Sequence, residues 1–325
     1  MTSIDFDDTG ELAVTCRTDD TLQIFNCKLS QHAKELRSQK YGAHLAQFTH
    51  HSSSIIYAST KVNHDIRYLS THDNSYLQYF KGHEAAVTCL TMSPSTDDFM
   101  SCSEDDTLRL WSLNTQNAKG ILKLKGAYLA AYDPTASVIA AASSLTQELL
   151  LYDLRNFDKA PFSTFDLRDY DLRFNPGAES PNWTRLEFSN CGKYILVGTA
   201  GTGHYIIDSF EGQLRHFCKR SAPSSRRPPG DKISSRVAGQ GDVTFSPDGK
   251  FLLGGSGNDE GVLVWDLGQR QTPDSILRAS HTLPFPPNIK DRVENCVYNP
   301  RFNFLMTADQ NTYMWFPDQE LYAPI

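Results

Sequence analysis

Residues 82–112 read GHEAAVTCLTMSPSTDDFMSCSEDDTLRLWS, and their pattern is the strongest indication of the fold. It contains an apolar strand pattern, a turn rich in Ser and Pro, a strand of small residues and a third strand that ends in a bulky aromatic residue. Short alternating segments separated by turn residues predict antiparallel strands and no helix. The same order of segments returns along the chain, so the sequence predicts an internal repeat.

A turn of this kind occurs seven times. The turns start at positions 7, 50, 93, 133, 189, 246 and 299, which are 43, 43, 40, 56, 57 and 53 residues apart. Gly, Pro, Asp, Asn and Ser fill them because these residues tolerate the backbone angles of tight turns. Units of about 40–45 residues with four short strands are typical of β-propeller blades. We therefore predict an all-β fold, a single seven-bladed propeller over residues 1–325.

Each turn follows an apolar first strand and precedes a second strand of small residues, and a third and a fourth strand complete the unit. The predicted fourth strands are KELRSQ, YLQYF, ILKLK, FSTF, LRHF and, at residues 275–279, SILRA. The seventh unit has no clear fourth strand. Residues 168–182 are predicted as a long loop before the strand that begins at Trp183, and we expect Trp183 to be a core aromatic rather than a partner anchor.

The composition excludes several classes of protein. Lys and Arg number 31 and Asp and Glu number 38, so the net charge of −7 disfavours a protein that grips nucleic-acid backbone. No apolar run approaches the roughly 18–20 residues that span a bilayer, and the N-terminus lacks the pattern of a secretory signal. The seven cysteines are scattered without paired spacing, which disfavours disulfides and structural zinc. We expect no cofactor, no metal and no membrane contact.

No catalytic motif is found in the chain. A Gly-rich phosphate loop, an HExxH motif and a GxSxG motif do not occur. A propeller enzyme would need carboxylates or histidines that converge on the axis, and the predicted inner strands offer mostly Ser, Thr, Cys and apolar residues. The sequence therefore favours a non-catalytic platform for other chains over an enzyme.

Third strands that end in LWS and VWD, and the GH pair that opens the third unit, resemble the WD-repeat family. In that family a His, a Ser or Thr, an Asp and a Trp form a hydrogen-bonded chain within a blade. The matching residues here are His83, Ser101, Asp105 and Trp111. Buried polar groups that satisfy one another stiffen a core, so the expected role is structural. A catalytic His-Ser-Asp set is disfavoured because these groups would be locked between strands.

Longer stretches carry a more specific resemblance. STKVNHDIRYLSTHDN (residues 59–74), LYDLRNFDKAPF (151–162) and WTRLEFS (183–189) resemble the small WD-repeat subunits of the COMPASS histone H3 lysine-4 methyltransferase. The resemblance covers residues 3–316 and implies a nuclear scaffold that binds a SET-domain methyltransferase subunit. It also implies partners in the mRNA cleavage and polyadenylation machinery, in a phosphatase complex of transcription termination, and in the phosphorylated tail of RNA polymerase II.

Two sets of loops are expected to share one face of the ring. They join the fourth strand of a blade to the next blade, and the second strand to the third. In the first two units they hold the residues that we predict as a basic partner-binding patch, namely Arg17, Lys40, Tyr41, Lys61 and His64. Such a patch could meet an acidic or phosphorylated peptide. The alternative, scattered exposed cations without a common ligand, stays open.

A basic segment separates the fifth and sixth units. Residues 219–240, KRSAPSSRRPPGDKISSRVAGQ, hold six basic residues and one acid. Their Pro, Ser and Gly content cannot bury a core, so we predict a flexible insert. It could be a nuclear-import signal, a contact for phosphate-bearing partners, or a solvated loop on the rim.

A second function stays open as the alternative. Asp153 and Arg155 lie in a YDLR stretch that resembles the WD-x-R box of substrate receptors in cullin-type ubiquitin ligases. In those receptors the Asp and the Arg contact an adaptor. Short WD-repeat segments produce this pattern by chance, so the scaffold reading is preferred.

Overall fold

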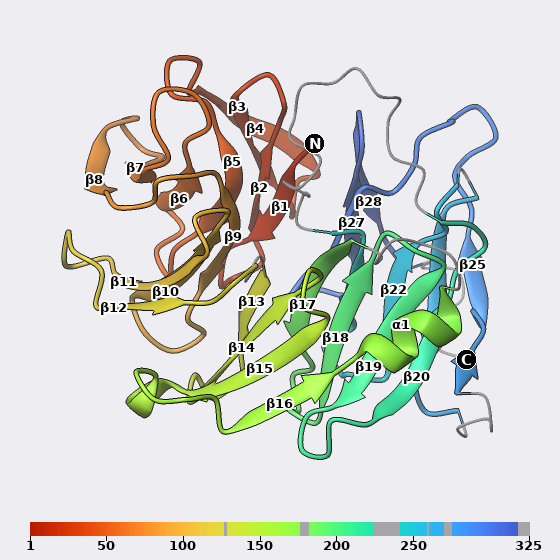
Figure 1. Cartoon of the computed structure of the whole chain (residues 1–325). Coiled ribbons are helices and arrows are strands. Elements are labelled where there is room, and N and C mark those ends of the chain that lie inside the picture. The colour runs from red at the N-terminus through yellow and green to blue at the C-terminus, as the bar shows by residue number, and fades with distance from the viewer. Residues whose placement is uncertain (127–128, 176–181, 224–240, 259, 270–274, 318–325) are drawn as a thin grey trace.

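Seven small sheets surround a common axis. The computed structural model describes residues 1–126, 129–175, 182–223, 241–258, 260–269 and 275–317. The chain passes from blade to blade around the axis, as the colours of Figure 1 show, and one short strand, Ile276–Leu277, returns to an earlier blade. The predicted all-β, seven-bladed propeller is confirmed.

Blades one to four each contain four antiparallel strands in chain order. From the axis outward, the strands are β1 (Ser3–Phe6), β2 (Leu12–Cys16), β3 (Thr21–Asn26) and β4 (Gln31–Arg37) in blade one; β5 (His44–Phe48), β6 (Ser54–Ala58), β7 (Ile66–Ser70) and β8 (Tyr76–Phe80) in blade two; β9 (Val87–Met92), β10 (Asp98–Ser103), β11 (Thr107–Ser112) and β12 (Gly120–Lys123) in blade three; and β13 (Leu129–Tyr132), β14 (Val138–Ser143), β15 (Glu148–Asp153) and β16 (Ser163–Asp166) in blade four. A 3-10 turn, η1 (Leu154–Asn156), follows β15.

Blades five to seven depart from this plan. Their strands are β17 (Trp183–Phe188), β18 (Tyr194–Thr199), β19 (Gly203–Asp208), β20 (Leu214–Lys219) and β24 (Ile276–Leu277) in blade five; β21 (Val243–Phe245), β22 (Phe251–Gly255), β23 (Val262–Asp266) and β25 (His281–Leu283) in blade six; and β26 (Asn295–Tyr298), β27 (Leu305–Ala308) and β28 (Thr312–Trp315) in blade seven. The described part of blade seven thus has three strands.

The prediction that residues 275–279 form the fourth strand of the sixth unit is wrong. Ile276–Leu277 pairs in parallel with β20, with Ile276 opposite Phe217, and extends blade five. The outer strand of blade six is β25, which pairs with β23. Leu277 is buried in the core between these two blades, whereas β25 is mostly exposed. β25 therefore lacks the apolar alternation by which a strand is recognised in a sequence.

The prediction of a loop over residues 168–182 is wrong in its first half, because Arg168–Phe174 forms the helix α1 (Figure 1). Asp171 anchors the helix. Its buried carboxylate accepts hydrogen bonds from the Tyr205 hydroxyl at 2.5 Å and the Gln147 amide at 3.1 Å. Burial raises the pKa of Asp171 to about 6 although these hydrogen bonds favour the ionised form. Trp183 lies in the core and is 5% exposed.

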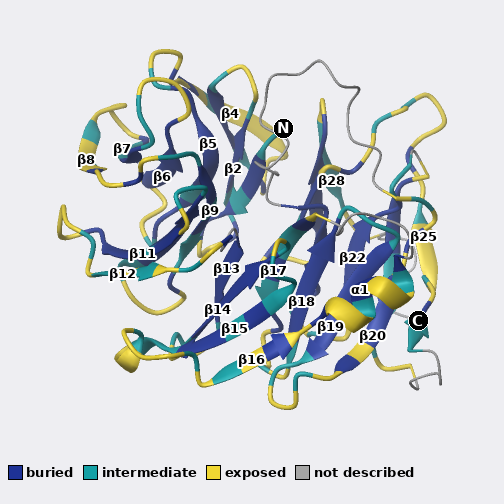
Figure 2. Ribbon diagram, viewed as in Figure 1, coloured by how far each residue is buried: buried dark blue, intermediate teal, exposed yellow. Residues whose placement is uncertain are grey.

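The core lies between neighbouring blades rather than in one central mass. Figure 2 shows the strands buried and the connecting turns exposed. β14 illustrates the packing: Ala140 and Ala142 contribute to the core shared with blade five, and Ala141 faces the core shared with blade three. Because strand side chains alternate between two faces, small residues on both faces let the sheets stack closely.

The ring closes where blade seven meets blade one. The rings of Phe6 and Phe304 pack edge to face with their centres 5.6 Å apart. The amino group of Met1 donates a hydrogen bond to the carbonyl of Asp309 at 2.7 Å. No helix in the described part of the chain has the length and hydrophobicity needed to cross a membrane.

Candidate partner-binding surface

The predicted polar chain of blade three is brought together by β10, β11 and the loop before β9. His83 Nδ1 lies 2.9 Å from the Asp105 carboxylate, and its Nε2 lies 2.7 Å from the Ser101 hydroxyl. The Trp111 indole N–H donates to the same hydroxyl at 2.9 Å. Burial lowers the pKa of His83, so a neutral ring donates to Asp105 and accepts from Ser101. Every group has an internal partner, which supports a structural role.

Arg220, predicted as part of the flexible basic insert over residues 219–240, lies inside the fold. It is 4% exposed and donates to both carboxylate oxygens of Asp242 at 2.6 Å. Its Nε also donates to His204 Nε2 at 2.9 Å. For this residue the prediction is wrong, because an ion pair between blades five and six, in which Arg220 Nη2 contacts both Asp242 carboxylate oxygens, compensates the buried charge. Residues 224–240 of the insert lie outside the described residues.

The five residues of the predicted basic patch lie in three loops at one end of blades one and two. They are Arg17 after β2, Lys40 and Tyr41 between β4 and β5, and Lys61 and His64 between β6 and β7. Backbone hydrogen bonds connect two of these loops. The N–H groups of Thr60 and Lys61 donate to the carbonyl of Tyr41 at 3.0 and 2.9 Å. The structure thus brings the predicted residues to a single surface, which we call the loop face.

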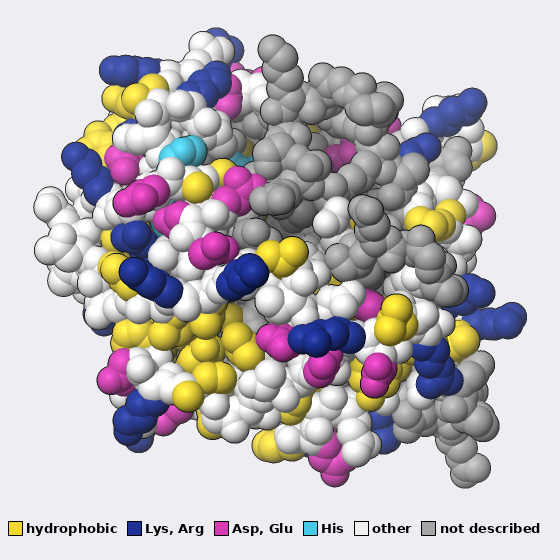
Figure 3. All heavy atoms as spheres, viewed as in Figure 1, with side chains coloured by type: hydrophobic (Ala, Val, Ile, Leu, Met, Phe, Trp, Pro, Cys, Tyr) yellow, Lys and Arg dark blue, Asp and Glu magenta, His cyan; other side chains and the backbone are white. Residues whose placement is uncertain are grey.

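The cations of the loop face are not equivalent. The Lys61 ammonium pairs with the Asp20 carboxylate, so its charge is largely compensated. Lys40 places its ammonium 5.1 Å from the ring centre of Tyr41. Neither Lys40 nor Arg17 forms an ion pair with any described residue. Basic and acidic side chains are interspersed on the side of the molecule seen in Figure 3.

Sequence reasoning missed Arg67, which supports the loop face from beneath. Its guanidinium carbon lies 3.5 Å from the ring centre of Tyr41, and 5.4 and 5.0 Å from those of Tyr76 and Tyr79. Arg67 is 2% exposed, and its Nε donates to the Ser59 hydroxyl at 2.7 Å. No carboxylate among the described residues pairs with it. A buried guanidinium held by tyrosine faces keeps Tyr41 in place and leaves its positive charge uncompensated.

Two observations in the sequence point toward Arg67. It interrupts the apolar strand IRYLS, and the next strand, YLQYF, supplies two of the three tyrosines.

His64, by contrast, is half-buried, and its Nδ1 has no hydrogen-bond partner. The pKa of the neighbouring His83 is lowered mainly by burial, and His64 makes a smaller electrostatic contribution in the same direction. The structure therefore places His64 toward blade three, at the border of the loop face.

Comparison with known proteins agrees with the repeat architecture. The family model described as "WD domain, G-beta repeat" matches residues 74–112 and 237–266. "WD repeat-containing protein 82" of Drosophila melanogaster is 37% identical over 323 residues, which cover 98% of this chain and 91% of that protein. The chain belongs to the WD-repeat family.

Two fungal WD-repeat relatives align over a similar extent. "Set1 complex component swd2" of Schizosaccharomyces pombe is 35% identical and covers 97% of this chain and 92% of its own. "COMPASS component SWD2" of Saccharomyces cerevisiae is 32% identical and covers 98% of this chain and 91% of its own. The family resemblance of the sequence is thereby confirmed.

The WD-x-R-like residues of blade four lie in η1. Asp153 accepts a hydrogen bond from the N–H of Arg155 at 3.0 Å and one from the Asn156 side chain at 2.8 Å. The carboxylate therefore caps the turn that follows β15. Arg155 is exposed. This geometry accounts for Asp153 locally, and it gives no added support to an adaptor contact.

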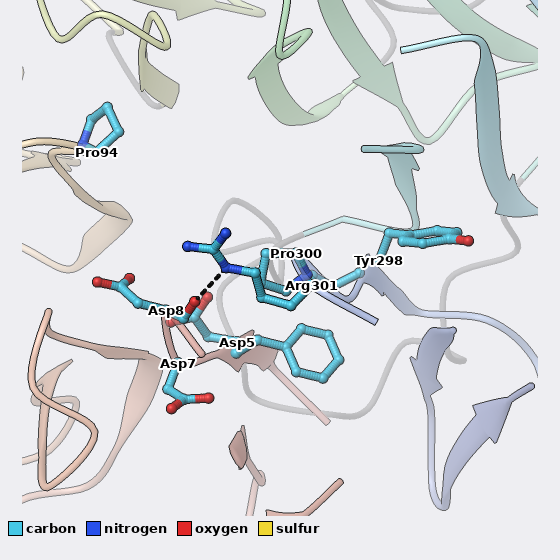
Figure 4. Close-up of a pocket in the computed structure, with 9 residues that line it drawn as sticks. Asp5, Asp7, Asp8, Pro94, Tyr298, Pro300 and Arg301 are labelled. Carbon is cyan, nitrogen blue, oxygen red and sulfur yellow. Dashed lines mark hydrogen bonds between the residues drawn. The ribbon is translucent and has the colours of Figure 1, made fainter. Parts of the chain in front are cut away.

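An open cavity of about 460 Å³ lies near the axis at the end of the ring opposite the loop face (Figure 4). Its lining includes Asp5, Asp7, Asp8, Pro94 and Arg301. The carboxylates serve the fold. Asp5 accepts from the N–H of Phe48 at 2.7 Å, and Asp7 accepts from the N–H of Leu12 at 2.9 Å. Among the described residues, no group of three His, Cys, Asp or Glu could hold a metal ion.

The inner strands are more polar than we predicted from the sequence. Besides Asp5, they carry Arg185 and Glu187, which form an ion pair at 2.7 Å. Glu187 also accepts from the Thr244 hydroxyl at 3.3 Å and the N–H of Phe245 at 3.4 Å. These groups join blade five to blade six, just as Asp5 joins blade one to blade two. Their polar atoms are thus used to bind the ring together.

Proposed function

We propose that this protein is the non-catalytic WD-repeat scaffold subunit of a SET-domain histone H3 lysine-4 methyltransferase complex of the COMPASS type. The observation that carries the proposal is the near full-length similarity to two proteins whose names place them in the Set1 complex and in COMPASS. In this role the protein acts in the nucleus and binds the SET-domain subunit directly or through neighbouring subunits.

A scaffold role fits the chemistry of the molecule. The His-Ser-Asp set is occupied by its own hydrogen bonds, and the polar residues near the axis connect one blade to the next. Such groups stiffen the ring and do not present a free nucleophile or base to a substrate. The exposed loops of a stiff ring give partner chains a preformed surface, which lowers the entropic cost of binding.

We extend the proposal to the machinery of mRNA 3′-end cleavage and polyadenylation and of transcription termination. Its partners there are cleavage-factor or phosphatase-complex subunits. The support is the resemblance carried by residues 59–74 and 151–162. The first of these stretches forms part of the loop face, so different complexes can use the same surface in turn.

The loop face is the site that we propose for phosphorylated peptides, among them the tail of RNA polymerase II. Lys40 and Arg17 supply cations that form no ion pair with a described residue, the Arg17 charge being partly balanced by nearby Asp19, and Tyr41 supplies an aromatic surface that Arg67 holds from below. A phosphate group combines a double negative charge with three strong acceptor oxygens, and cations that lack an internal partner suit it best. Lys61 is secondary because Asp20 already pairs with it.

Affinity purification followed by mass spectrometry tests the scaffold role. The full chain should recover a SET-domain methyltransferase from nuclear extract, together with cleavage-factor or phosphatase subunits. The loop-face variant Arg17→Glu/Lys40→Glu is compared with Lys193→Glu/Lys250→Glu, which reverses two exposed lysines in turns at the opposite end of the ring. We expect the control to behave as wild type. Failure of the wild-type chain to recover any SET-domain protein would refute the scaffold role.

Fluorescence anisotropy with a phosphorylated peptide from the tail of RNA polymerase II tests the loop-face site separately. We expect the Arg17→Glu/Lys40→Glu variant to bind at least about tenfold more weakly than wild type, because each lost charge-assisted hydrogen bond contributes about 1.5–3 kcal/mol. The Lys193→Glu/Lys250→Glu control should retain the wild-type affinity. Equal loss in both variants would show general electrostatic attraction and would argue against this site.

A further inference from the structure

Two cysteines face each other across neighbouring strands of blade three. Cys89 in β9 is directly opposite Cys102 in β10. Opposite residues of antiparallel strands point to the same face, with Cα atoms about 4.5–5.5 Å apart. This separation lies within the range of about 4.4–6.8 Å that a disulfide spans. Both thiols are free, and both contribute to the cluster between blades three and four.

The two thiols have different surroundings. Cys89 is partly exposed on the innermost strand, and Cys102 is fully buried. A hydrogen bond from Cys102 lowers the pKa of Cys89 to about 7, whereas burial raises the pKa of Cys102 well above its ordinary value. The more accessible thiol is therefore also the more acidic one, which is the arrangement that an attacking thiolate and a resolving thiol require.

Blade one shows that the fold does not need sulfur at this position. Ser3 occupies the place of Cys89 and is opposite Cys16. The Ser3 hydroxyl accepts the N–H of Ala46 from the next blade at 2.9 Å, as Cys89 Sγ accepts the N–H of Ala130 at 3.5 Å. A hydroxyl thus makes the same bond between blades. The sulfur of Cys89 is therefore not required for packing between blades, and it adds redox chemistry to blade three.

We propose that Cys89 and Cys102 form a reversible dithiol–disulfide modification site that responds to hydrogen peroxide. The Cys89 thiolate attacks one peroxide oxygen, the O–O bond breaks, and hydroxide leaves, which gives Cys89 sulfenic acid. The Cys102 sulfur then attacks the Cys89 sulfur. An S–S bond forms, and the Cys102 proton leaves with the departing hydroxyl as water. A dithiol reductant reverses the reaction by thiol–disulfide exchange.

Oxidation changes the contact between blades three and four. In the reduced state Cys89 Sγ lies 3.4 Å from the carbonyl of Ala130 and 3.5 Å from its N–H. Formation of an S–S bond draws this sulfur closer to Cys102, and we expect both contacts with Ala130 to weaken. Cys102 also lies between Ser101 and Ser103, and Ser101 belongs to the polar chain of blade three. We therefore expect the first structural effect of oxidation in these two blades.

Peptide mass spectrometry tests the proposal on the folded, full-length chain. The protein is treated with hydrogen peroxide, its remaining thiols are alkylated, and it is digested with trypsin. Residues 82–109 contain no Lys or Arg before Arg109, so both cysteines lie in one tryptic peptide. We expect this peptide to lose two hydrogen atoms and to carry no alkyl group. After cleavage at Asp97 and Asp98, between the cysteines, the halves should stay joined until a reductant is added.

Variants separate this pair from general oxidation. Cys89→Ser keeps a hydroxyl for the bond to blade four, as Ser3 does in blade one, and should abolish the disulfide. Cys102→Ala should let Cys89 proceed to sulfinic acid. The exposed Cys191 reports that the oxidant was active, and Cys16, opposite Ser3, should stay reduced. A dithiol at residues 89 and 102 that survives when Cys191 is oxidised would overturn the proposal.

Discussion

At the scale of single residues, one hydroxyl holds the polar chain of blade three together. Ser101 Oγ contacts both the His83 ring and the Trp111 indole, and all three side chains are buried. Ser101→Ala leaves two buried polar groups without partners, so we expect a loss of about 2–4 kcal/mol in the free energy of unfolding in urea. Ser53→Ala, which removes an exposed hydroxyl, should change it by less than about 0.5 kcal/mol. Equal effects of the two substitutions would contradict the structural role.

A buried carboxyl gives a second residue-scale prediction. The pKa of Asp171 is raised to about 6 in the folded chain, above its ordinary value, so the folded state holds this proton more tightly than the unfolded state. Protonation therefore stabilises the fold at low pH, and this contribution is lost as the pH rises through about 6. Asp171→Asn removes the dependence.

The measurement is the stability difference between wild type and Asp171→Asn at two pH values. We expect wild type to gain about 1–3 kcal/mol relative to the variant between pH 7.5 and pH 4.5. Groups elsewhere titrate in both proteins and cancel in this difference. A difference that is independent of pH would show that the Asp171 carboxyl titrates normally.

The sequence predicted some of these residues and not others for a physical reason. His83, Ser101, Asp105 and Trp111 lie within one repeat unit, so their spacing resembles a family pattern and could be read directly. Tyr205, the partner of Asp171, lies 34 positions away in another unit. No local pattern contains such a pair, because only the folded ring brings it together.

At the scale of elements, blade six is joined to blade five by a buried ion pair. Arg220 after β20 and Asp242 before β21 are both buried. Arg220→Met leaves the Asp242 carboxylate buried without its partner, so we expect a loss of about 3–5 kcal/mol in unfolding free energy. The double variant Arg220→Met/Asp242→Leu should be less destabilised, because no charge stays unpaired. A double variant that is worse than the single one would contradict this account.

The same scale shows where pattern reading fails for strands. An alternating pattern identifies a strand but not the neighbour with which it pairs. Ile276–Leu277 is apolar like a core strand and pairs with β20 of blade five, whereas the short polar sequence of β25 is typical of a loop. The helix α1 was missed because its seven residues are too few for a helical period, and its first residue follows Leu167, which makes no side-chain cap.

At the scale of the whole molecule, polar ties run around the ring. Asp5 reaches from blade one to blade two, Gln47 from blade two to blade three, and Glu187 from blade five to blade six. Each side chain accepts a main-chain N–H of the next blade. Ties of this kind make the blades one stiff body, so the exposed loops and not the interior are free to bind other chains. The repeat spacing predicted the ring, but these ties depend on which inner-strand residue faces the neighbouring blade.

Under the proposed function, partner chains hold the protein by the loop face of blades one and two. Hydrogen–deuterium exchange of backbone amides, compared between the free chain and the affinity-purified complex, tests this claim most directly. We expect slower exchange in the complex at residues 38–43 and 59–65, and unchanged exchange at residues 93–96 and 246–250 at the opposite end of the ring. Protection confined to the opposite end, with the loop face unchanged, would contradict it.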